Sequence, residues 1–445
     1  MSATYEDRNE VLAHLASEMG PFVVGPIPAE AFLDMFLPPA SSVPPFAKGM
    51  FSHLSQMMYS ECDETSWYDV FVSSEPPHRP PHLLLILPFQ TQIMSPHMKN
   101  LDIFNTSHST NQALSDEFGF DLQPGCSVYP KGCGTENLDV SRVDFTIEFK
   151  SDCDPFVDEP SVSNDSNSNS NPFLHSSRDA ATALGQLTAY ATAVMSAQYR
   201  THLFMVFIVK EQARLIRWDR SGAVVTKSIK YTEQRHLFEF FFRYDTADPE
   251  ARGHDSTIGI PTDDEVAQAK LIVPELKDKK AFLAFTISKQ RFITHGPVAS
   301  EPRIPVGRWT RVSFACDINQ KRRVLLKDSW RVFLRDFEPE GKTYRRLHEH
   351  KVPNIPLCLL ADDVGKDDYH HSRTQEVKDK YFAHHTCWQL TPRRHYCIVL
   401  GTIGRELKKF RHTWEFVNAM HAALKGKIII FLAVCLRNLT VRLTL

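Results

Sequence analysis

The chain contains 445 residues, enough for two or three domains that each bury a core of their own. Hydrophobic residues make up 42% of it and charged residues 23%, which is typical of a globular protein in water. The formal net charge is only −2, so no overall electric field attracts the chain to nucleic acid or to a membrane surface.

The N-terminal segment and the cysteines indicate an intracellular protein. MSATYEDRNEVLAHL has early acidic groups and no basic stretch followed by an apolar one, which argues against a secretory signal. The longest apolar run, at 428–436, is far shorter than the roughly 20 residues that cross a bilayer. Nine irregularly spaced cysteines without a Cys-x-x-Cys pair favour neither a disulfide framework nor a zinc ribbon. We therefore expect the cytoplasm or the nucleus, and no membrane partner.

The first two regions of the chain differ in regularity. Residues 1–115 mix short helical patterns with proline-rich breaks and predict an irregular helical region. Residues 116–245 predict an α/β domain: a strand VDFTIEFK, a Ser/Asn-rich insertion at 154–178 that we expect to be disordered, and a long amphipathic helix capped by Ser177. The strands THLFMVFIV, ARLIRWD and AVVTKSI then predict an antiparallel meander, closed by a helix near 234–244.

Four polar residues of this domain form two short motifs. Glu148 and Lys150 share one face of the predicted strand, and Gln186 and Tyr190 share one face of the following helix. A strand with Glu-x-Lys followed by a helix with Gln-x-x-x-Tyr resembles the PD-(D/E)xK nuclease superfamily. The resemblance implies that an upstream Asp and the Glu bind magnesium, and that the Lys orients or activates water. A strand edge with alternating charges is the other explanation of Glu148 and Lys150.

The upstream acid of that pattern is missing here. The segment reads QPGCSVYP, so Gly125 follows Pro124 where the Asp is expected, with Asp121 and Asp144 as the nearby acids. A single carboxylate holds magnesium poorly, because the ion prefers several oxygen ligands. We therefore predict that the domain does not cleave nucleic acid but binds or scaffolds a partner, and nucleic acid stays open as an alternative.

The remaining elements follow in an order known from one fold. Residues 246–299 predict a linker and a hairpin, FLAFTISKQRFITHG. Residues 300–445 continue with strand PVGRWTRVSFAC, turn DINQ, strand KRRVLLKDSW, helix EPEGKTYRRLHEH and strand HYCIVLG, the element order of the small lobe of a protein kinase. Lys327 lies in an apolar strand, and Glu340 opens the helix after Pro339. In kinases such a lysine contacts ATP phosphates and is held by such a glutamate, although a lone Lys–Glu pair is usually a surface ion pair.

Longer strings make the resemblance specific. LLKDSWR, EPEGKTYRRLHEHKVPNIP and RHYCIVLGTIGREL, with ARLIRWDRSGAVVT and RGHDSTIG upstream, resemble the fungal-type protein kinase family over some two thirds of the chain. The resemblance implies a kinase fold, ATP with magnesium, and transfer to Ser or Thr hydroxyls. It makes Lys327 the phosphate lysine and Glu340 its partner, places Gly307 in the nucleotide loop, and makes Leu400 and Gly401 the hinge that receives adenine.

The sequence departs from this family where the reaction takes place. The family has HRDISVGN and this chain has LRNLTVRL, so Asn438 replaces the catalytic Asp and Leu443 the metal-binding Asn. No Asp-Phe-Gly occurs, and Trp309 and Val312 stand where kinases often have glycine. An Asn amide cannot accept the proton of a substrate hydroxyl, so we predict no phosphate transfer by this polypeptide.

The sequence thus predicts an α+β and α/β fold: a nuclease-like middle domain, then a kinase-like small lobe of an antiparallel sheet plus one helix, with an incomplete large lobe. The favoured function is a non-catalytic kinase-like protein that binds ATP and protein partners of unknown identity. The alternatives are an active family-type kinase with a truncated gene model, and a nuclease-like scaffold that binds nucleic acid.

Overall fold

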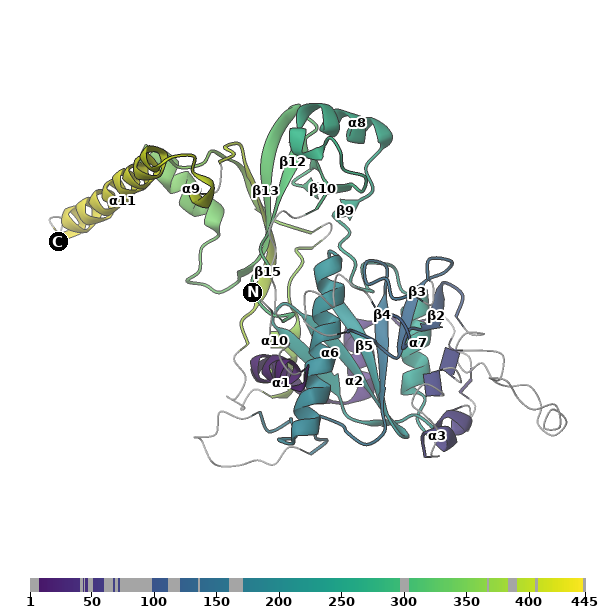
Figure 1. The fold of residues 1–445 in the computed structure, drawn as a ribbon. Helices are drawn as coiled ribbons and strands as arrows, with labels where there is room; N and C mark the ends of the chain where they lie inside the picture. The colour runs from purple at the N-terminus through teal and green to yellow at the C-terminus, as the bar shows by residue number, and fades with distance from the viewer. Residues whose placement is uncertain are drawn as a thin grey trace. The chain divides into compact units, whose positions relative to one another are not determined.

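The chain forms two compact units whose segments alternate along the sequence, as seen in a computed structural model (Figure 1). The first unit holds residues 1–255, 302–307 and 372–392, and the second holds 256–301, 308–371 and 393–445. The structure describes residues 8–40, 43, 45–46, 51–59, 67–68, 71–72, 98–110, 121–134, 137–159, 171–296, 304–365, 368–382, 390–404 and 407–442. Among these residues, no helix combines the length and the apolar composition needed to span a bilayer.

A mixed sheet of eight strands forms the centre of the first unit. Its order is β1-β7-β6-β5-β4-β3-β2, with β8 pairing to β6. The β1–β7 and β4–β5 pairs are parallel and the other pairs antiparallel. The strands are β1 (Val23–Ile27), β2 (Leu101–Asn105), β3 (Cys126–Pro130), β4 (Phe145–Lys150), β5 (His202–Val209), β6 (Gln212–Asp219), β7 (Gly222–Thr226) and β8 (Ile229–Lys230).

Helices cover both faces of this sheet. α6 (Arg178–Ala197) begins at the predicted cap, where Ser177 Oγ accepts a hydrogen bond from Ala180 N–H, and lies along one face (Figure 1). The opposite face carries the main apolar core, to which β4 contributes every second residue together with α2 (Ala29–Phe36), α3 (Ser52–Met58) and α7 (His236–Thr246). The period-two alternation of β4 therefore leaves Glu148 and Lys150 on the α6 face.

The N-terminal region is more regular than the sequence predicted. α1 (Arg8–Met19) packs directly on α6, where a Cβ on Gly185 would lie 2.0 Å from the carbonyl oxygen of Leu12. Only a glycine allows this close approach of the two helices. β1 joins the sheet as an edge strand beside β7. Residues 1–115 are thus in part an integral element of the first unit, rather than a separate irregular region.

The Ser/Asn-rich insertion needs a correction at both ends. Residues 160–170 lie outside the described residues, but 154–158 and 171–174 are buried or half-buried. Asp154 and Asp158 both bind the guanidinium of Arg214, at 2.7 and 2.8 Å, and Asn171 donates to two backbone carbonyls near β1. The composition of the segment predicted disorder because it has few apolar residues. Composition does not show which charged groups will pair, and here charge-assisted hydrogen bonds hold the segment in place.

The second unit contains an antiparallel sheet of seven strands in the order β14-β15-β13-β12-β11-β10-β9. The hairpin predicted within the linker region 246–299 is part of this sheet, so the second unit starts at residue 256 and not near 300. The elements are β9 (Ile258–Gly259), α8 (Asp263–Ile272), β10 (Leu283–Ile287), β11 (Gln290–Thr294), β12 (Arg311–Asp317), β13 (Arg322–Val332), α9 (Glu340–Glu349), β14 (Cys358–Asp363), β15 (Arg393–Leu400) and α11 (Thr413–Arg442).

Two segments that lie between strands of the second unit belong to the first. Both reach the turn 219–222, which links β6 to β7. Gly307 N–H, between β11 and β12, donates to the carbonyl of Arg220 at 3.0 Å. Asp219 accepts the backbone N–H groups of Arg373 and Thr374 at the start of α10 (Thr374–Tyr381), between β14 and β15. This turn therefore anchors both returning segments.

Candidate functional site

The second unit brings Lys327 and Glu340 together as predicted. Lys327 Nζ lies 2.8 Å from Glu340 Oε1 and 2.7 Å from Oε2, so the ammonium group is shared between both carboxylate oxygens. Lys327 occupies the middle of β13, flanked by Val312 on β12 and Ile398 on β15. Both side chains are partly exposed, at 23% and 31%, which leaves the pair accessible to a ligand.

A glycine beside Glu340 sets the position of α9. Gly341 N–H donates to Tyr396 Oη at 3.0 Å, and a Cβ on Gly341 would lie 2.5 Å from both that oxygen and Ala361 Cβ. The first turn of α9 therefore lies directly on β14 and β15. Tyr344, one turn later, packs against the apolar cluster of Tyr396 and Ile398. These contacts hold Glu340 over Lys327.

The predicted hinge residues lie at the C-terminal end of β15. Leu400 is the last residue of β15 and is buried, whereas Gly401 is exposed. Gly401 N–H donates to the carbonyl of Leu357 at 2.8 Å, and Leu357 N–H donates to Thr402 Oγ1 at 3.0 Å, so the β14 side of this segment is already paired. On β13, Leu325 pairs with Leu400 and lies two residues before Lys327.

The predicted nucleotide loop is placed differently. The strand expected from Pro305 onward begins only at Arg311, and Gly307 lies in the long connection 295–310 between β11 and β12. Gly307 has φ +127°, a left-handed value that favours glycine, but its N–H is used by Arg220 of the first unit. Trp309 is buried, and the guanidinium carbon of Arg311 lies over its ring, 5.7 Å from the ring centroid. The described residues of this connection do not form a tight glycine-rich hairpin.

The segment compared with the kinase catalytic loop is helical. Asn438 lies within α11, which runs without a break from Thr413 to Arg442, and Leu443 lies outside the described residues. In the first part of this helix the large apolar side chains of Trp414, Val417 and Leu424 are exposed.

The first unit assembles the residues of the Glu-x-Lys and Gln-x-x-x-Tyr motifs around one carboxylate. Glu148 Oε1 accepts Gln186 Nε2 and Lys150 Nζ, both at 2.9 Å, and Oε2 accepts Gly125 N–H at 3.2 Å. Gln186 Nε2 also reaches Tyr190 Oη at 2.6 Å, and that hydroxyl donates to the carbonyl of Gln123. The two sequence motifs therefore form one buried hydrogen-bonded cluster between β4 and α6.

The place of the missing acid in this cluster is filled. A Cβ on Gly125 would lie 2.3 Å from the ring of Tyr68, which packs edge-on against Phe149 at 5.2 Å. Asp121 is exposed, whereas the carboxylate of Asp144 is buried and accepts hydrogen bonds from Arg200, Arg252 and His254. Asp144 is bound in this way and so does not take the place of the absent acid.

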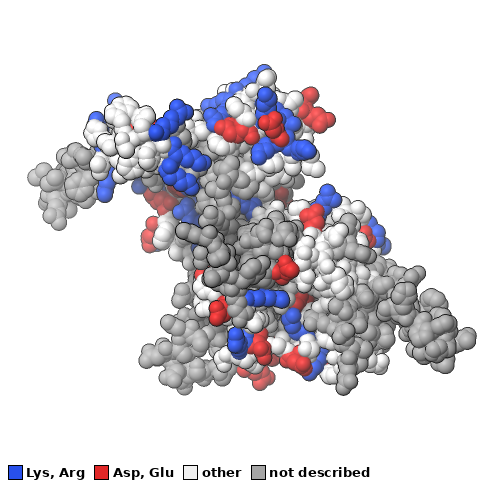
Figure 2. Space-filling model, in the orientation of Figure 1, with Lys and Arg blue, Asp and Glu red and all other residues white. Residues whose placement is uncertain are grey.

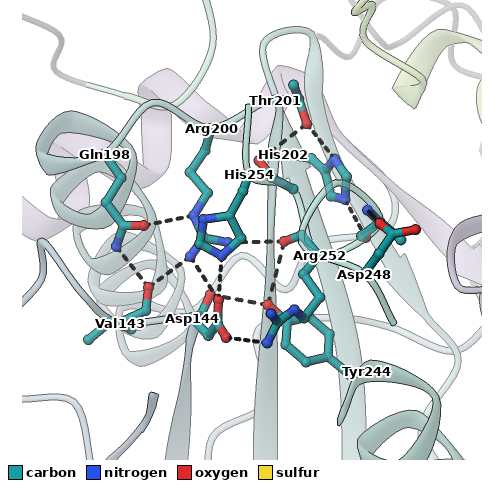
Figure 3. Close-up of polar contacts among 12 residues, drawn as sticks. Val143, Asp144, Gln198, Arg200, Thr201, His202, Tyr244, Asp248, Arg252 and His254 are labelled. Atoms are coloured by element: carbon teal, nitrogen blue, oxygen red, sulfur yellow. Dashed lines mark hydrogen bonds and ion pairs between the residues drawn. The ribbon is translucent and has the colours of Figure 1, made fainter. Parts of the chain in front are cut away.

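Asp144 is the centre of a polar cluster that sequence reasoning missed (Figure 3). Its carboxylate is fully buried and accepts Arg200 Nη2 at 3.1 Å, His254 Nε2 at 2.7 Å and Arg252 Nη1 at 2.9 Å. Burial alone would raise the pKa of Asp144, but the His254 hydrogen bond and the two guanidinium groups hold it below its ordinary value. The string RGHDSTIG, noted only as a family resemblance, supplies Arg252 and His254 to this cluster.

Comparison with known proteins identifies the family. A model of the family described as fungal protein kinase matches residues 171–434, more than half of the chain. The chain therefore belongs to the fungal protein kinase family. No curated protein and no solved structure matches it significantly. The match includes both returning segments and the turn 219–222, but Glu148 and Lys150 precede it, and it gives no support to the nuclease resemblance.

Proposed function

We propose that the second unit binds the phosphates of a nucleoside triphosphate with magnesium at Lys327. The observation that carries the proposal is the two-oxygen contact between Lys327 and Glu340, because this pair is what kinases use to hold the α- and β-phosphates. The surrounding order of strand, helix and strand supports it, as does membership of the family. Gly401, at the end of β15, would then lie beside the adenine base.

We further propose that the polypeptide of these 445 residues does not transfer phosphate. The reaction needs a carboxylate beside the acceptor hydroxyl and another that holds the metal. At the first of these positions the sequence has Asn438, and it contains no Asp-Phe-Gly to supply the second. The helical state of the backbone around Asn438 supports the same conclusion, because a catalytic loop is not helical.

Titration with ATP and magnesium by calorimetry tests the binding proposal. Lys327→Met should weaken the affinity at least about tenfold, because a hydrogen bond to a charged group contributes roughly 1.5–3 kcal/mol. Lys342→Met is the matched control, since Lys342 is an exposed lysine on α9 itself. Equal affinities of the two variants would refute the role of Lys327, and phosphate transfer that Lys327→Met abolishes would refute the inactivity.

For the first unit we propose a nuclease-like frame that does not cleave nucleic acid. The order β2-β3-β4, then α6, then β5 parallel to β4 supports the frame, together with the cluster on Glu148. Tyr68 fills the space at Gly125, so the frame offers one carboxylate where two are needed. Figure 2 shows acidic and basic side chains next to one another on the described part of its face, in keeping with the near-neutral charge.

Incubation with plasmid DNA and magnesium tests this second proposal. We expect no cutting by the purified chain at any enzyme concentration. Cutting that disappears in Lys150→Ala but persists in Lys131→Ala, an exposed lysine on the same unit, would contradict it.

A further inference from the structure

Three potential metal ligands lie together on the face of the second sheet opposite to Lys327. Asp328 follows Lys327 on β13 and so points to the other face. Cys397 is its direct cross-strand partner on β15, and His395 lies two residues earlier on the same face. One carboxylate oxygen, one ring nitrogen and the thiol sulfur lie within 4.8 Å of one another, and all three residues are buried.

The donor atoms already converge on a single carboxylate oxygen. Asp328 Oδ1 accepts a short hydrogen bond from His395 Nε2, and Cys397 Sγ lies 3.5 Å from the same oxygen. Carboxylate, imidazole and thiolate are the three ligand types that zinc accepts, at bond lengths of about 2.0–2.3 Å. Atoms this close to one another can surround one ion with only small side-chain movements.

Two neighbouring aromatic rings restrict the orientation of the His395 imidazole. Its imidazole is stacked between Trp330, at a centroid distance of 5.1 Å, and His370, at 5.7 Å. His370 Nδ1 lies 3.4 Å from His395 Nδ1. A ligand histidine usually donates its second N–H to an acceptor, and His370 can accept from Nδ1 when Nε2 binds a metal.

We propose that Asp328, His395 and Cys397 form a zinc site that joins β13 to β15. Binding exchanges the Cys397 thiol proton for the metal, so at least about one proton is released to solvent for each ion. The Asp328 carboxylate stays ionised, and the proton of neutral His395 resides on Nδ1. Three protein ligands leave one tetrahedral position for a water molecule. On the β12 side of Asp328 stands Arg311, whose positive charge also faces this carboxylate.

Metal analysis of the purified full chain tests the site. We expect about one equivalent of zinc after dialysis, and a thiolate-to-metal charge-transfer band when cobalt(II) replaces zinc. Cys397→Ser should abolish this band and weaken zinc binding more than His370→Ala, for which a loss of about 10–100-fold is expected. Cys316→Ser is the control, because Cys316 is a buried thiol of the same sheet on β12, outside the ligand group.

Two results would overturn the proposal. One is that the wild-type protein binds no zinc and that cobalt(II) gives no thiolate-to-metal charge-transfer band. The other is a metal whose binding Cys397→Ser leaves unchanged, which means an ion held elsewhere. If Cys397→Ser fails to fold, His370→Ala keeps the proposal falsifiable, because a zinc affinity equal to that of the wild type would contradict a site in which His370 holds the His395 ligand.

Discussion

At the scale of single residues, the Lys327–Glu340 contact depends on the absence of one side chain. Gly341 allows the start of α9 to touch Tyr396 and Ala361, and Glu340 precedes it directly. A larger residue must move the helix away from the sheet, because Ala361 Cβ belongs to a paired strand and cannot retreat far. The carboxylate would then leave Lys327.

We therefore expect Gly341→Val to destabilise the chain by about 1–3 kcal/mol, the usual cost of overpacking. Valine is a cleaner test than alanine, whose helix propensity offsets up to about 1 kcal/mol. Nucleotide affinity, measured by calorimetry, should fall together with the free energy of unfolding, measured in urea. Gly259→Val is the control, because no atom lies within 4 Å of a Cβ built there. An unchanged affinity in Gly341→Val would show that α9 does not position the phosphate site.

At the scale of elements, α10 depends on a carboxylate that lies far from it in the sequence. Asp219 is fully buried and ends β6. Its Oδ2 accepts the N–H groups of Arg373 and Thr374 at 2.7 and 3.1 Å, and its Oδ1 accepts the Thr374 hydroxyl. Arg217 adds an ion pair at 2.8 Å. The side chain thus acts as a cap supplied by another strand, and it satisfies N–H groups that a helix leaves unpaired.

Asp219→Asn should destabilise the chain by about 3–5 kcal/mol, because it leaves the buried Arg217 without its counter-charge. Hydrogen exchange should increase over residues 372–382. The comparison variant is Asp263→Asn, which removes an exposed acid from the first turn of α8 and should cost less than about 1 kcal/mol. Similar losses in the two variants, measured by urea unfolding, would contradict the capping role.

At the scale of the whole molecule, the chain leaves each unit and re-enters it twice. The segments 302–307 and 372–392 of the first unit are flanked on both sides by strands of the second. A single cut therefore cannot separate the units without removing partners of the turn 219–222. The first unit also buries ionisable groups, His202 among them, and these make the stability of the chain sensitive to acid.

We expect the free energy of unfolding to fall as the pH drops below about 6.5. Burial lowers the pKa of His202 well below 6.5, and burial also lowers that of His254, so the unfolded chain binds protons that the folded chain refuses. Asp144, whose pKa is lowered from 3.8, adds a loss at still lower pH. Urea unfolding at about pH 7.5 and about pH 5.5 measures this slope, up to about 1.4 kcal/mol per pH unit for a fully shifted histidine. His202→Gln should reduce the slope and the exposed His14→Gln should not; equal slopes would contradict this assignment.

The sequence by itself determined the elements whose pattern is local. The Ser177 cap and the apolar stripe predicted α6, short strand-forming runs predicted β4 to β6, and the resemblance to the small lobe of a kinase predicted the contact between Lys327 and Glu340. Long strings of the sequence also indicated the fungal protein kinase family, and a family match over 171–434 confirms that family. These features depend on neighbours within a few residues or on extended identity, so the order of the residues contains them.

Only the tertiary structure decided what joins distant segments. Asp328, His395 and Cys397 are separated by up to 69 residues, and the register of β13 against β15 brings them together. The hydrogen bond from Gly307 N–H to the carbonyl of Arg220 is another such contact. Because of it, Gly307 lies in a segment of the first unit and not in the predicted nucleotide loop. The packing of 154–158 is a third case, where charge pairs outweigh a composition that predicted disorder. Hydrogen bonds and ion pairs across a sheet carry no periodic signal, and so they appear only once the chain is folded.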